Sequence, residues 1–115
     1  MIPQFNTDGN LPSGIYLVTW DDFCVTFGPS SHRQRLIAGL MAAIVPLRTS
    51  GCARLYVDGS FVTTKDVPND YDVAWDPVGV DLAKLKSLEP VFFDFNNRRA
   101  AQKAKFFGEF FPSSA

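Results

Sequence analysis

The sequence predicts an α+β domain, in which a small mixed β-sheet of at least three strands carries helices mainly on one face. Leucine, isoleucine and methionine recur at helical spacing over residues 36–45, which indicates a long amphipathic helix. Short runs of aliphatic and aromatic residues at 54–57, 71–75 and 91–95 are typical of strands. A chain of 115 residues has room for one core and not for two, so residues 1–115 form a single domain.

The first quarter of the chain predicts an arm followed by a short helix. Residues 1–18 are rich in proline, glycine and asparagine and are expected to form an irregular arm laid over the domain. Thr19 and Asp22 resemble a capping box, which starts a helix that runs to about Phe27. Gly28 and the proline after it end this helix.

The longest predicted helix follows directly. Ser30 or Ser31 is expected to cap it, because a serine side chain accepts a hydrogen bond from a free backbone N–H of the first turn. Pro46 is expected to kink or end it, because proline lacks that donor and clashes with the preceding turn. Ser50 and the glycine after it give the last stop signal.

The second half alternates between predicted strands and helices. Strands are expected at 54–57 and 71–75, and a third at 91–95. Asp81 is expected to cap a helix of about two turns between the second and third of these strands. The closing stretch 98–111, basic at its start and aromatic at its end, predicts a C-terminal helix.

The composition excludes several classes of protein. A net charge of −1 gives no overall attraction to nucleic acid or to an anionic membrane. Two cysteines without metal spacing and a single histidine make a zinc site or a disulfide framework improbable. The N-terminus lacks the features of a signal peptide, and no apolar run is long enough to cross a bilayer. These observations predict a cytoplasmic protein that does not enter membranes.

The most informative segment lies between the first two predicted strands. Gly59-Ser60 leaves the first strand, and nine residues later Asp70-Tyr71-Asp72 opens the second. Side chains alternate along a strand, so Asp70 and Asp72 point the same way, with Cα atoms about 6.6 Å apart. Two carboxylates this close repel unless one is protonated or a cation lies between them. Mg²⁺, which prefers oxygen ligands and substrate phosphates, is the natural occupant.

This arrangement resembles the signature of the nucleotidyltransferase superfamily typified by DNA polymerase β. The resemblance covers residues 52–95, the motif core. The whole chain also looks like a small bacterial family of nucleotidyltransferase-like proteins, which has a Pro-x-Phe-Asn segment near its N-terminus. That family closes with Gln-Lys-Ala-Lys-Phe-Phe-Gly-Glu-Phe-Phe-Pro, found here at residues 102–112. This second resemblance implies no particular activity.

The superfamily resemblance implies a metal site made of three carboxylates. Asp70 and Asp72 would hold Mg²⁺, and a third acid on a later, neighbouring strand would complete the catalytic set. Asp94 is the candidate, because a lone acid in an apolar run is costly to bury unless it is paired, protonated or metal-bound. Coordinates that place Asp94 on the opposite side of the sheet would remove this interpretation.

The expected nucleotide site lies at the Gly-Ser turn. Gly59 lets the backbone approach a phosphate closely, and Ser60 adds a hydroxyl. Lys65 is the expected phosphate contact, and the cations of residues 98–105 are further candidates. Two departures weaken this expectation: Asp58 stands where the superfamily usually has an apolar residue, and the Ala-Arg-Gly found after the turn in many small bacterial members is absent.

The reaction implied is Mg²⁺-dependent transfer of a nucleoside monophosphate from a nucleoside triphosphate to a hydroxyl on protein or RNA. Small bacterial members of the superfamily often belong to toxin–antitoxin or phage-defence pairs, and the resemblance extends that expectation to this chain. Catalysis of such a transfer comes mainly from positioning and from neutralising charge.

Three alternatives stay open. Asp58-Gly59 between two apolar runs is also a strong signal for a tight hairpin, which would leave the carboxylates as surface turn residues. A catalytically inactive module of the same fold would act by binding a protein partner. It could also form a homodimer through Phe106, Phe107, Phe110 and Phe111, or these side chains could be covered by strands that a shortened chain lacks. The basic helix alone would support RNA binding without catalysis.

Overall fold

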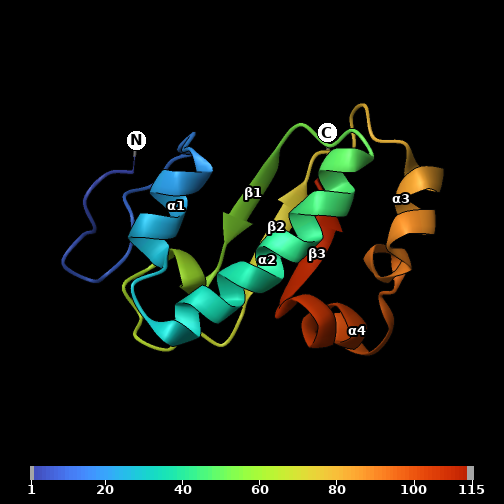
Figure 1. Ribbon diagram of the computed structural model, residues 1–115. Helices are drawn as coiled ribbons and strands as arrows, with labels where there is room; N and C mark the ends of the chain where they lie inside the picture. The colour runs from blue at the N-terminus through green and yellow to red at the C-terminus, as the bar shows by residue number, and fades with distance from the viewer. Residues whose placement is uncertain (1, 114–115) are drawn as a thin grey trace.

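The computed structural model describes residues 2–113, and their fold is α+β. The elements in chain order are α1 (Trp20–Phe27), α2 (Ser31–Thr49), β1 (Leu55–Asp58), the 3₁₀ turn η1 (Ser60–Val62), β2 (Tyr71–Trp75), α3 (Leu82–Leu88), the 3₁₀ turn η2 (Pro90–Phe93), α4 (Asn96–Phe106) and β3 (Gly108–Pro112). The strands form one mixed sheet in the order β1-β2-β3, with β1 antiparallel and β3 parallel to β2. In Figure 1, α2 crosses one face of this sheet, α1 lies beyond β1, and α3 and α4 lie on the β3 side.

The helix starts follow the local signals of the sequence. The Thr19 hydroxyl accepts a hydrogen bond from the Asp22 N–H (3.1 Å), and the Ser30 hydroxyl accepts one from the Arg33 N–H (3.2 Å). Asp81 caps α3 in the same way. Each cap satisfies a backbone donor of the first turn that has no partner within its helix. Residues 2–18 form the expected irregular arm.

Helix α2 does not end at Pro46, although a proline was expected to kink or end it. The helix continues to Thr49, and the Pro46 carbonyl accepts a hydrogen bond from the Ser50 N–H at 3.0 Å. The missing proline N–H costs the helix one hydrogen bond. Burial of Leu40, Ala43 and Leu47 of the same helix in the core offsets this cost.

Two predictions for the last quarter of the chain are wrong. The stretch 91–95 is not a strand, because Pro90 opens the 3₁₀ turn η2, where its fixed φ and missing donor fit the first position. A short apolar run does not by itself distinguish a buried strand from a buried turn. The stretch 98–111 is not one helix: α4 ends at Phe106, Phe107 takes a left-handed conformation (φ 67°), and the strand β3 follows.

The tight-hairpin interpretation of Asp58-Gly59 is also wrong. Strand β1 pairs with β2 in a register that joins Leu55 to Trp75 and Asp58 to Asp72. Residues 59–70 therefore form a long connection that contains η1, and they do not fold back as a second strand directly after the turn.

The core lies between the sheet and the helices. Tyr71, Val73 and Trp75 of β2 point into it, while Asp72 and Ala74 point to the other face. Phe106 and Phe110 belong to the core, with 1% and 0% of their surface exposed. Two of the four phenylalanines expected at a dimer surface are therefore already covered by the chain itself.

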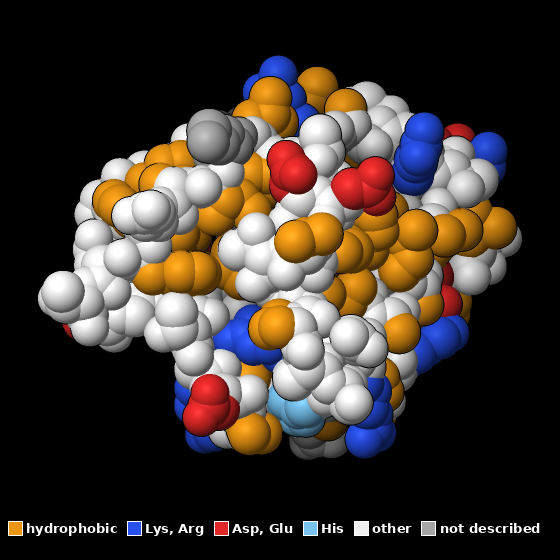
Figure 2. Space-filling view, turned by 60° about the vertical axis from the view of Figure 1, so that its left-hand side comes forward, with side chains coloured by type: hydrophobic (Ala, Val, Ile, Leu, Met, Phe, Trp, Pro, Cys, Tyr) orange, Lys and Arg blue, Asp and Glu red, His pale blue; other side chains and the backbone are white. Residues whose placement is uncertain are grey.

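The surface carries apolar side chains from several segments. Ile15, Val25, Val67 and Val78 remain exposed, and they come from the arm, α1 and two loops. Figure 2 shows such apolar side chains interspersed with polar ones over one face of the molecule. Among residues 2–113, no helix has the length and apolar character needed to cross a membrane.

Candidate functional site

Three carboxylates lie side by side across the sheet. Asp58 of β1 pairs in register with Asp72 of β2, which in turn pairs with Glu109 of β3. Residues directly opposite one another on neighbouring strands project to the same face, so the three side chains form one row on the face away from the core. We call Asp58, Asp72 and Glu109 the acidic row.

Asp70 joins this row from the residue before β2. Tyr71 between them is buried, and Asp70, one residue before the strand, lies close enough for its charge to act on Asp72. Burial raises the pKa of Asp72 above the usual value for an aspartate, and repulsion by neighbouring carboxylates raises it further. Those neighbours are Glu109, Asp70 and Asp58, in decreasing order of effect. The structure thus brings together the two aspartates singled out from the sequence.

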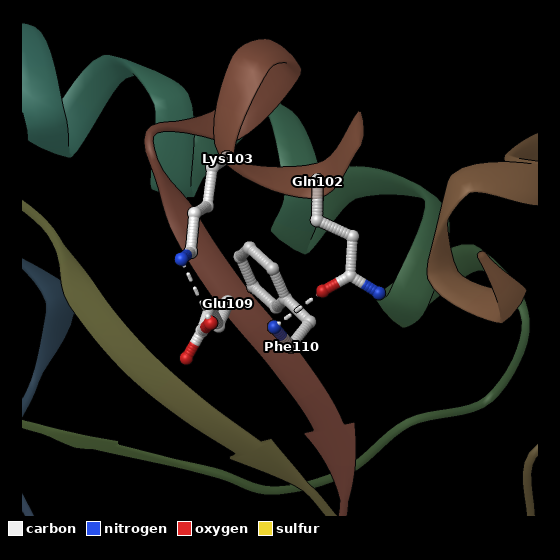
Figure 3. Close-up of polar contacts among 4 residues, drawn as sticks. All are labelled: Gln102, Lys103, Glu109 and Phe110. Atoms are coloured by element: carbon white, nitrogen blue, oxygen red, sulfur yellow. Dashed lines mark hydrogen bonds and ion pairs between the residues drawn. The ribbon is translucent and has the colours of Figure 1, made fainter. Parts of the chain in front are cut away.

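Glu109 stands between a carboxyl group and an ammonium group. It lies beside Asp72 on the neighbouring strand, and among the neighbouring groups it is the one that raises the Asp72 pKa most. On its other side, Lys103 Nζ of α4 lies 3.1 Å from Glu109 Oε1. Figure 3 shows Lys103 and Gln102 reaching β3 from successive positions of α4. Gln102 is fully buried and accepts a hydrogen bond from the Phe110 N–H at 2.7 Å, which ties the middle of β3 to α4.

Asp94 does not have the position expected for the third carboxylate. It follows η2 rather than lying on a strand, and its Oδ1 accepts a hydrogen bond from the Asn96 N–H at 3.1 Å. It is not among the carboxylates that act on Asp72. The third acid beside Asp72 is Glu109, because the strand parallel to β2 is β3 and not the stretch 91–95. The catalytic and metal-binding roles expected of Asp94 therefore lose the geometry on which they rested.

The Gly59-Ser60 turn adjoins the acidic row. Gly59 has φ 91°, a conformation that residues with a Cβ rarely adopt, and a Cβ here would lie 3.2 Å from Asp72 Oδ2. Glycine therefore lets the turn pass close to the carboxylate. At the turn where the backbone was expected to approach a phosphate, the Gly59 N–H donates to Asp58 Oδ1 at 2.8 Å. Ser60 opens η1 and is partly buried.

The connection between turn and strand is anchored to α2 by Arg33. This side chain is 4% exposed and donates to four backbone carbonyls at 2.7–3.1 Å, those of Phe27, Phe61, Thr63 and Lys65. Its neighbour His32 contacts the Pro68 carbonyl through Nε2 at 2.5 Å, so Nε2 carries the hydrogen. Lys65, expected to contact phosphate, is exposed on this connection, and its carbonyl is one of those that Arg33 holds.

An open cleft of about 300 Å³ lies beside Asp70. Its lining residues come from α2, from the segment before β2 and from the end of α4: His32, Arg35, Leu36, Asn69, Asp70, Lys103 and Phe107. We call it the α2–α4 cleft. Arg35 lies over the Phe107 ring, with its guanidinium carbon 4.7 Å from the ring centre. Sequence patterns gave no reason to group Arg35 with the site, because it lies far from the motif along the chain.

Carboxylate oxygens are ligands that hard divalent cations take. Within residues 2–113, no three His, Cys, Asp or Glu side chains stand in an arrangement that would enclose a metal by themselves. Mg²⁺ does not need such a cage, since it is usually held by one or two carboxylates together with waters and substrate phosphates. Asp70 and Asp72 are the two carboxylates that could serve as such ligands; the Asp72 pKa is raised first by burial and then by the negative charges of its neighbours.

Comparison with known proteins identifies a family. Residues 3–115 match the model of a family described as a family of unknown function, DUF6932. The chain belongs to the DUF6932 family. No curated protein and no solved structure matches it significantly. The DUF6932 match spans the acidic row, the Gly59-Ser60 turn and the α2–α4 cleft, and the description of the family assigns no role to any of them.

Proposed function

We propose that this DUF6932 protein is a Mg²⁺-dependent nucleotidyltransferase that transfers a nucleoside monophosphate from a nucleoside triphosphate to a hydroxyl on protein or RNA. One observation carries the proposal: Asp72 lies in the acidic row, beside Asp70, with the Gly59 backbone against its carboxylate. In this proposal Glu109 replaces Asp94 as the third carboxylate of the site. A bound Mg²⁺ would neutralise charge on the phosphates and on the attacking oxygen.

The chain itself contributes position and charge to this reaction. Asp70 and Asp72 would hold the cation, and Glu109, which is held by Lys103, lies beside Asp72 on the neighbouring strand. Arg33 fixes the connection that carries the turn, so turn and strand keep one relative position. Preorganisation of this kind supplies much of the rate enhancement in phosphoryl transfer.

Three isosteric substitutions test the assignment. Asp72→Asn should abolish Mg²⁺-dependent binding of a non-hydrolysable nucleoside triphosphate, and Glu109→Gln should weaken it. Asp94→Asn is the matched control, because asparagine can still accept the hydrogen bond from the Asn96 N–H. Equilibrium dialysis with each of the four nucleotides, with and without Mg²⁺, gives the measurement. Binding that survives Asp72→Asn, or that is lost in Asp94→Asn and kept in Glu109→Gln, would show the assignment to be wrong.

Turnover needs its own assay. Label from α-³²P nucleoside triphosphates should appear in protein or RNA when the wild-type chain is present, and not with Asp72→Asn.

A second candidate, a catalytically inactive module that acts through a partner, is favoured by the bonds that already engage the site. Asp58 accepts from the Gly59 N–H, and Glu109 is paired with Lys103. Nucleotide binding without any label transfer, together with a partner recovered in a stoichiometric complex, would support this candidate over the enzyme.

A further inference from the structure

The α2–α4 cleft has sides of opposite charge. Arg35 of α2 and Lys103 of α4 bring cations to it, and Asp70 brings a carboxylate from the segment before β2. Asp70 is also one of the two proposed metal-binding aspartates. A ligand that fits both sides must itself be bipolar, with anionic oxygens at one end and a cation at the other.

Arg35 is free to donate hydrogen bonds. It takes part in neither of the two ion pairs found within residues 2–113, and its side chain is exposed. Its guanidinium lies over the Phe107 ring, which occupies one face of the group. The N–H donors lie in the guanidinium plane, so stacking of this kind leaves them available to a phosphate.

The Gly-Ser turn is poorly prepared to bind phosphates. The Gly59 N–H is engaged by Asp58 Oδ1 at 2.8 Å, and this carboxylate places negative charge at the turn. An incoming phosphate would displace a hydrogen bond and meet a like charge there. The α2–α4 cleft is lined by two cations and by Asp70; Lys103 is paired with Glu109 at 3.1 Å, whereas Arg35 takes part in no ion pair within residues 2–113. The phosphates are therefore better accommodated in the cleft than on the turn.

We propose that the α2–α4 cleft binds the metal-chelated polyphosphate tail of the nucleotide. Phosphate oxygens contact Arg35 and Lys103, and the chelated cation faces Asp70. His32 lines the same cleft, and its ring is held in place by the Pro68 carbonyl. This inference rests on the proposed function for the nucleotide, and it replaces Gly59, Ser60 and Lys65 as the main phosphate contacts.

Calorimetric titration of the full chain with Mg²⁺-pyrophosphate tests the cleft directly. Arg35→Gln should weaken binding roughly 10- to 100-fold, the effect of losing charge-assisted hydrogen bonds. Arg35→Lys should recover part of it, because lysine keeps the charge and loses the planar fork. Arg48→Gln is the matched control. It removes the same charge from the other end of α2, where Arg48 and Arg54 line a second open cleft.

These measurements test phosphate binding in the cleft independently of the proposed enzymatic activity. Absence of pyrophosphate binding to the wild-type chain, an unchanged affinity in Arg35→Gln, or an equal loss in Arg48→Gln overturns the inference. Pyrophosphate binding without binding of a non-hydrolysable nucleoside triphosphate also overturns it, because the ligand would then be free pyrophosphate. Nucleotide binding that survives Asp72→Asn, combined with pyrophosphate binding that is weakened by Arg35→Gln, would reject the proposed enzyme and keep the anion-binding site in the cleft.

Discussion

Replacement of Arg33 by methionine should release the connection 59–70, which adjoins the candidate site, from its anchor on α2. Arg33 donates to the Phe27 and Phe61 carbonyls in buried surroundings, and to the Thr63 and Lys65 carbonyls nearer the surface. Methionine has a similar length and packs well, but it satisfies none of these acceptors.

The magnitude follows from which acceptors water can reach. Each buried acceptor left without a partner costs about 1–3 kcal/mol, so the two buried carbonyls together cost about 2–6 kcal/mol. The two outer carbonyls can be rehydrated and add little. Removing a cation whose pKa is lowered, chiefly by burial, returns part of this cost. We expect the free energy of unfolding to fall by about 3 kcal/mol, a large share of the total stability of about 5–15 kcal/mol.

Urea denaturation followed by tryptophan fluorescence measures this loss. Arg33→Lys should lose about half as much, because its three donors reach fewer acceptors. Arg48→Met on the exposed part of α2 should stay within about 0.5 kcal/mol of the wild type. A loss below about 0.5 kcal/mol for Arg33→Met would refute the view that this side chain anchors the connection.

Three further substitutions have defined outcomes. Asp72→Asn should raise the melting temperature at neutral pH without Mg²⁺, since relief of cross-strand repulsion is worth roughly 0.2–1 kcal/mol per pair. Because the folded-state pKa of Asp72 is raised, its contribution to stability is full below about pH 4 and is lost as pH rises through that pKa. The difference in melting temperature between variant and wild type should therefore grow with pH, and a constant difference would contradict this. Gly39→Ala should destabilise by about 1–3 kcal/mol, because the new Cβ would clash with the Phe106 carbonyl oxygen, although helix propensity alone predicts a gain of about 1 kcal/mol; a stabilised variant in urea denaturation would refute this packing. Gln102→Leu should cost about 1–3 kcal/mol, because it leaves the Phe110 N–H without its side-chain partner, whereas the Val91 carbonyl keeps its hydrogen bond from the Asp94 N–H; an unchanged unfolding midpoint would contradict this.

The sequence predicted the position of Asp72 on β2 and misplaced Asp94, while the roles given to both stay predictions. Asp72 lies beside Gly59 on the face of β2 away from the core, as alternation along a strand requires, and Asp70 comes one residue before the strand. Asp94 was chosen because an isolated acid in an apolar run suggested a strand, and a proline-initiated 3₁₀ turn took that place. Glu109 lies in a run that was expected to be helical, and the left-handed Phe107 that ends α4 was not foreseeable from the residue type.

The sequence by itself determined the helix caps and the first two strands, because these depend on hydrogen bonds and side-chain alternation within a few residues. Thr19, Ser30 and Asp81 each cap the helix expected of them, and β2 begins and ends where its pattern predicts. Only the tertiary structure decided which acid stands beside Asp72 and which cations line the cleft. Parallel pairing of β2 with β3, and the close approach of α2 to α4, join residues that no local signal connects. Their contacts depend on how the core packs as a whole, where Phe106 and Phe110 are buried together.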